Sequence, residues 1–107
     1  MVGLGALAQE HLDKAAASEH GRSAHLLVHE GPLRQTLIAL TAGQELDEHN
    51  PPAAATLQVL SGRVRLVAVD GGYELSAGEL RAIPRERHGL AALEDAAVLL
   101  TTVTGVD

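Results

Sequence analysis

Short apolar runs, separated every few residues by turn-forming residues, limit the fold of this chain more than any other feature. Glycine, proline or acidic residues separate these runs, and no helical periodicity lies between them. The predicted strands span residues 24–29, 33–40, 45–49, 55–60, 64–69, 73–75, 80–83, 89–93 and 97–104. Many short strands joined by tight turns are typical of an antiparallel sandwich or barrel. We therefore expect an all-β fold.

A helix is predicted ahead of the strands. Its apolar face carries Leu4, Leu7, Ala8, His11, Leu12 and Ala15. Residues three and four apart share a face of a helix, so the pattern predicts an amphipathic helix over residues 4–18. We expect residues 1–20 to form this N-terminal helix, packed as a lid on the barrel or on a partner subunit. Residues 21–107 then form one β-barrel domain.

Composition excludes several classes of function. The chain has 107 residues, a net charge of −6, no cysteine and a single aromatic residue, Tyr73. Scattered basic residues argue against a nucleic-acid partner, and the lack of cysteine excludes a thiolate metal site. The apolar runs are too short to span a membrane. The first eight residues lack the basic start of a secretion signal, so we expect a cytoplasmic protein.

Two spaced motifs carry the strongest resemblance to a known family. In the first, five residues separate a glycine from a histidine, and a second glycine closes the following strand. In the second, five residues separate a glycine from a proline, and a histidine follows. The residues are Gly43, His49, Gly62, Gly78, Pro84 and His88. This spacing resembles the paired motifs of the cupin family. The resemblance implies a double-stranded β-helix, or jelly-roll barrel.

The chain departs from the family pattern at the metal ligands. Pro51 stands where the family has its second histidine, and Ala55 stands where it has a glutamate. Glu86 replaces a glycine of the second motif, and His88 arrives one residue early. Of the four family ligands, His49 and His88 remain, so the resemblance implies a degenerate metal site.

A carboxylate near the two histidines would complete a metal site. Residues two apart share a face of a regular strand, so Asp47 is expected on the same face as His49. Asp47, His49 and His88 together would suit a divalent transition metal such as Fe, Mn, Ni or Zn. The simpler interpretation is that both histidines are polar residues at the barrel mouth.

Alternation along the strands predicts a mainly aliphatic pocket with two imidazoles at one end. The expected pocket residues are His49, Leu57, Val59, His88 and Leu90. Gln35 joins them if its face of residues 33–40 points inward. Both faces of that strand mix polar and apolar residues, so the alternative set of Arg34, Thr36, Ile38 and Leu40 stays open.

Other polar residues are expected on the surface. His11, His20, His25 and His29 lie outside the motifs and are interpreted as surface or interface residues. His25 and His29, four apart, are expected on one strand face. Three arginines precede or follow the second motif's proline and could attract an anion at the barrel mouth, although solvent exposure is the simpler interpretation. They are Arg81, Arg85 and Arg87.

Three functions fit these observations. The favoured hypothesis is a small cupin that binds a small molecule, with a degenerate or absent metal site. The alternative is a metal-dependent cupin enzyme, of oxygenase or isomerase type, using His49 and His88. A ligand-sensing domain that acts through a partner is the third. The predicted helix and the exposed edges of a small barrel favour a homodimer.

Overall fold

The computed structural model describes residues 1–49, 54–68, 71–84 and 88–104, with the backbone alone for residues 47–49. One helix, α1 (Leu4–Ala17), precedes the strands in the described part of the chain. The strands are β1 (Arg22–Glu30), β2 (Leu33–Leu40), β3 (Glu45–His49), β4 (Ala54–Ser61), β5 (Arg63–Ala68), β6 (Gly71–Ser76), β7 (Leu80–Ala82), β8 (His88–Ala92) and β9 (Ala96–Val103). The predicted all-β fold with a short N-terminal helix is confirmed.

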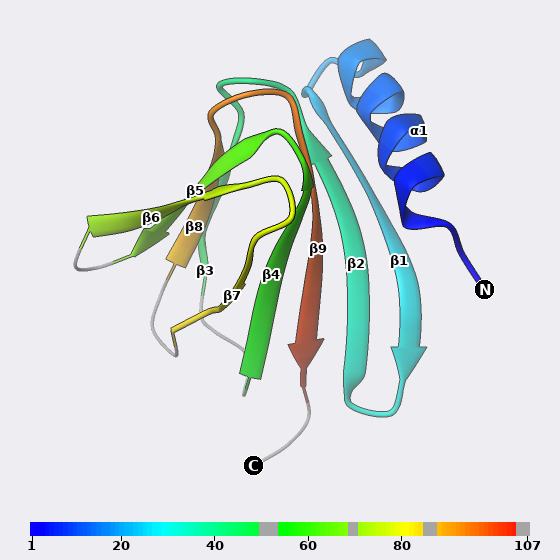
Figure 1. Cartoon of the computed structure of the whole chain (residues 1–107), viewed down its shortest axis with the longest axis vertical. Coiled ribbons are helices and arrows are strands. Elements are labelled where there is room, and N and C mark those ends of the chain that lie inside the picture. Colours follow the sequence, from blue (N-terminus) through cyan, green and yellow to red (C-terminus); the bar gives the residue numbers. More distant parts are fainter. Residues whose placement is uncertain (50–53, 69–70, 85–87, 105–107) are drawn as a thin grey trace.

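The strands form two antiparallel sheets that face each other. The five-stranded sheet has the order β1-β2-β9-β4-β7, and the four-stranded sheet has the order β3-β8-β5-β6. Figure 1 shows the four-stranded sheet on one side of the five-stranded sheet and α1 on the other side. The helix contacts β1, β2, β9 and β4. Among the described residues, no helix is long and apolar enough to cross a membrane.

An aliphatic core fills the space between the sheets. Its most deeply buried members are Leu40, Leu57, Val59, Val64, Leu66 and Val98, each at most 2% exposed. Burying one such side chain stabilises the fold by about 1.5–3 kcal/mol. Tyr73 lies at the border of this core and is partly buried. The narrow core is therefore held by small side chains, as expected from a chain with one aromatic residue.

Strand β2 separates this core from a smaller one under the helix. Leu37 packs with Ala8 of α1 and Ala97 of β9 in the second core. Ile38 and Leu40 instead belong to the core between the sheets. Side chains alternate between the two faces of a strand. The face of β2 that points toward the other sheet is therefore the one that carries Arg34, Thr36, Ile38 and Leu40.

A bulge in β1 changes which histidines share a face. The pairing register between β1 and β2 shifts between Leu26 and Val28. His25 pairs with Leu37, and His29 pairs with Arg34 on the opposite face of β2. The prediction that His25 and His29 share one face is therefore wrong, because one extra residue in a bulge reverses the alternation.

His11, interpreted from the sequence as a surface or interface residue, is buried where the helix meets the sheet. It is only 3% exposed, between α1 and the five-stranded sheet. Its Nδ1 lies 2.7 Å from Ser23 Oγ, and its ring centroid lies 5.5 Å from that of His25. Its place on the apolar face of the helix explains this burial, because that face docks on the sheet.

The turn between β4 and β5 yields a stability prediction. Gly62 has a φ of +77°, and a Cβ there would overlap the carbonyl oxygen of Asp95. Gly78 has a similar φ of +89°, but a Cβ there would meet no atom within 4 Å. Both alanine variants incur backbone strain of about 1–2 kcal/mol. Gly62→Ala alone adds overpacking, which costs about 1–3 kcal/mol more.

Urea unfolding of the two variants measures this difference. We expect Gly62→Ala to lower the free energy of unfolding clearly more than Gly78→Ala. Equal losses for the two variants would contradict the close packing of this turn against residue 95.

Candidate functional site

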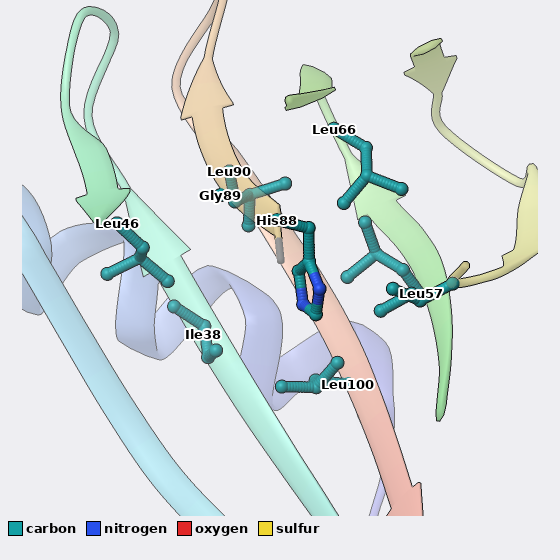
Figure 2. Close-up of a pocket in the computed structure, with 9 residues that line it drawn as sticks. Ile38, Leu46, Leu57, Leu66, His88, Gly89, Leu90 and Leu100 are labelled. Carbon is teal, nitrogen blue, oxygen red and sulfur yellow. The ribbon is translucent and has the colours of Figure 1, made fainter. Parts of the chain in front are cut away.

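A small cavity lies between the two sheets. Its wall is aliphatic apart from one imidazole and one glycine, and it comprises Ile38, Leu46, Leu57, Leu66, Ile83, His88, Gly89, Leu90 and Leu100. Figure 2 shows the imidazole of His88 among side chains that come from both sheets. The cavity volume is about 30 Å³. One water needs about 10–15 Å³ by this measure, so the cavity has room for about two.

His88 is the polar residue of this wall. It begins β8 and is 4% exposed. Its Cα pairs with that of Ala68 on β5 and with that of His49 on β3. A position between two hydrogen-bonded strands gives the residue a rigid backbone, so the imidazole has a defined place in the cavity. An imidazole in its neutral form can donate one hydrogen bond and accept another.

Three of the predicted pocket residues lie in the cavity wall and two do not. Leu57, His88 and Leu90 line the cavity. Val59 is fully buried further along the inner face of β4, in the core. Gln35 lies on the face of β2 that carries Leu37, away from the cavity, where its Nε2 donates to Thr101 Oγ1 at 3.2 Å.

The structure brings the backbone of His49 opposite that of His88. The two Cα positions pair across β3 and β8, but the register shifts between Leu46 and His49. Asp47 and His49 would share one face only on a regular strand, and β3 is not regular here. The side chains of Asp47 and His49 lie outside the described residues, as does Pro51.

The described residues do not fit a metal centre. Ala55, at the position of the family's glutamate, offers no ligand atom and packs against the inner core. Within residues 1–46, 54–68, 71–84 and 88–104, no three His, Cys, Asp or Glu side chains lie close enough to hold a metal ion. The one described ligand group in the cavity is His88, and its neighbours there are aliphatic.

Six of the cavity residues were not among the predicted pocket residues: Ile38, Leu46, Leu66, Ile83, Gly89 and Leu100. A usable signal exists for Leu66, because it alternates with the exposed Arg63 and the half-buried Arg65 of β5. For Ile38 the signal was ambiguous until the helix was placed, because both faces of β2 are partly apolar. These residues become predictable only once the partner of each strand face is known.

Comparison with known proteins supports the fold. No protein-family model matches the chain, and no curated protein sequence matches it. A protein of unknown function from Streptococcus pyogenes, SPY1581, is similar in structure, with 26% sequence identity and a TM-score of 0.75. The match covers 84% of this chain and 80% of that chain.

Two further solved structures are similar. A cupin superfamily protein from Desulfitobacterium hafniense has 17% identity and a TM-score of 0.75, over 84% of this chain and 86% of that chain. KdgF from a Halomonas species has 22% identity and a TM-score of 0.71, over 83% of this chain and 84% of that chain. At this level of identity, both matches bear on the fold alone.

Proposed function

We propose that this chain is a small cupin whose barrel binds a small, largely apolar molecule with one hydrogen-bonding group. The observation that carries the proposal is the buried imidazole of His88 in an otherwise aliphatic cavity. Apolar walls with a few placed polar groups are typical of small-molecule sites. The wall would supply affinity by excluding water, and His88 would orient the ligand.

The cavity size limits the ligand. Its volume of about 30 Å³ is far below the roughly 300–1,000 Å³ of sites for drug-sized ligands. A molecule of a few non-hydrogen atoms fits without rearrangement, and a larger one needs the leucine and isoleucine side chains of the wall to move. A short alcohol therefore matches both the size and the chemistry of the cavity.

Titration with 2-propanol, followed by methyl NMR, tests this proposal. We expect shifts at the methyl groups of Leu57, Leu66 and Leu100. His88→Leu keeps the bulk of the side chain but removes its hydrogen bond, and should weaken binding about fivefold, since one hydrogen bond contributes about 1 kcal/mol.

Leu100→Ala is the matched control, because it enlarges the same cavity and keeps the imidazole. We expect this variant to bind 2-propanol at least as tightly as the wild type. Unchanged affinity in His88→Leu, with an intact fold by circular dichroism, would contradict the role given to His88.

A metal-dependent enzyme of oxygenase or isomerase type is the second candidate. The pairing of the Cα positions of His49 and His88 across β3 and β8 favours it. With Asp47, these residues would supply two imidazoles and a carboxylate, a set that suits non-haem iron and related divalent metals. Ala55 at a ligand position speaks against it.

Metal content separates the two candidates. The binding-module proposal expects far less than one metal ion per chain in protein purified without chelators, and no change in His49→Ala or His88→Ala. The enzyme proposal expects about one equivalent of Fe, Mn, Ni or Zn by elemental analysis, lost in both variants and kept in the control His20→Ala.

A homodimer is a further prediction. Strand β1 is an edge of the five-stranded sheet, and Leu26 on it is 47% exposed. An open strand edge with exposed apolar surface favours pairing with a second chain. Sedimentation velocity at micromolar concentration should give the mass of two chains, and a monomer there would refute it.

A further inference from the structure

An open groove lies between β6 and β7, apart from the His88 cavity. It has a volume of about 410 Å³, and its lining residues, in residues 72–75 and 79–81, include none of the cavity residues. This volume lies within the usual range of small-molecule sites. By size alone, the groove is the better place for a ligand of more than a few atoms.

Arg81 is the cation of this groove. Its guanidinium carbon lies 3.6 Å from the ring centroid of Tyr73, so the two groups stack. Its Nε is buried and has no hydrogen-bond partner among the described residues. The ion pairs found among the described side chains involve Lys14, Arg63 and Arg65, a further contact joins His11 to Glu10, and none involves Arg81.

The two carboxylates at the groove are engaged elsewhere. Glu74 lies 3.8 Å from Arg63 and 3.6 Å from Arg65. It pairs with Arg65 in the sheet, on the face of β6 opposite to the inward Tyr73. Glu79 accepts a hydrogen bond from the Ser76 backbone at 2.7 Å. Among the side chains that the structure describes, the guanidinium of Arg81 is therefore left without a matched negative charge.

We propose that the groove binds a small aliphatic carboxylate. A guanidinium presents a planar pair of donors that matches a carboxylate, and stacking on an aromatic ring holds that plane in place. Leu80 lines the groove and is 65% exposed. It offers an apolar surface for the chain of the ligand, next to the charged group. A carboxylate with a short alkyl chain satisfies both features.

Two probes that differ only in the head group test the proposal: hexanoate and hexylamine at equal ionic strength. Tyr73 is the chain's single Phe, Trp or Tyr residue, so tyrosine fluorescence reports on the groove directly. We expect hexanoate to give a saturable change in fluorescence and in the amide signals of β6 and β7. Hexylamine should bind at least tenfold more weakly.

Four variants assign the binding to Arg81, with affinities measured by NMR. Arg81→Gln should bind hexanoate at least tenfold more weakly than the wild type. The affinity of Arg81→Lys should lie between the two, because lysine keeps the positive charge but lacks the planar pair of donors. The controls Arg34→Gln and Arg22→Gln, at exposed arginines of β2 and β1, should bind hexanoate as the wild type does.

Three results would overturn the proposal: equal binding of the two probes, full hexanoate affinity in Arg81→Gln, or an equal loss in Arg34→Gln. Urea unfolding checks that each variant is folded. Should Arg81→Gln fail to fold, Arg81→Lys and the comparison of head groups in the wild type still decide the matter.

Discussion

The packing of small aliphatic side chains between two facing sheets is the constraint on which the rest of this structure depends. Leu57, Val59, Val64 and Leu66 are almost completely buried there. Because these side chains are small, the core is filled by the close interdigitation of side chains from both sheets. The cavity beside His88 is a gap in this packing, and the groove between β6 and β7 shares none of its lining residues; both are proposed ligand sites.

The two proposed sites differ in chemistry because one lies between the sheets and the other lies between two sheet edges. The inner cavity is enclosed by aliphatic groups from both sheets, so a single imidazole sets its polarity. The outer groove lies at two sheet edges, where the partly buried Tyr73 and Arg81 meet. A small apolar ligand suits the first and a charged one suits the second. The barrel thus has two places of unlike character within a short chain.

The fold was largely predictable because its signals are local. Gly62 and Gly78 adopt positive φ at turns, and the strands between them follow the alternation of apolar residues. The jelly-roll fold that the resemblance to cupins implied rested in part on these turn residues, and it is confirmed. The face of Gln35 was not predictable, because both faces of β2 are buried in part, one by the second sheet and one by α1.

The site was only partly predictable because it depends on strand register. His88 and Leu90 follow simple alternation on β8 and do lie in the cavity wall. Asp47 and His49 lie where the register of β3 against β8 shifts. A shift of this kind is decided by the pairing with the neighbouring strand and not by the residues themselves. The same reason explains the wrong prediction for His25 and His29.

Because of the bulge in β1, the face to which each side chain of this strand points depends on whether residues are added or removed in odd or even numbers. Up to Leu26, the even-numbered residues of β1 lie opposite even-numbered residues of β2. From Val28 onward, the even-numbered residues of β1 lie opposite odd-numbered residues of β2. Removing or adding one residue there would move every side chain on one side of the change to the opposite face of the strand. Changes of two residues would preserve the faces. Length changes in this strand should therefore be tolerated in pairs of residues.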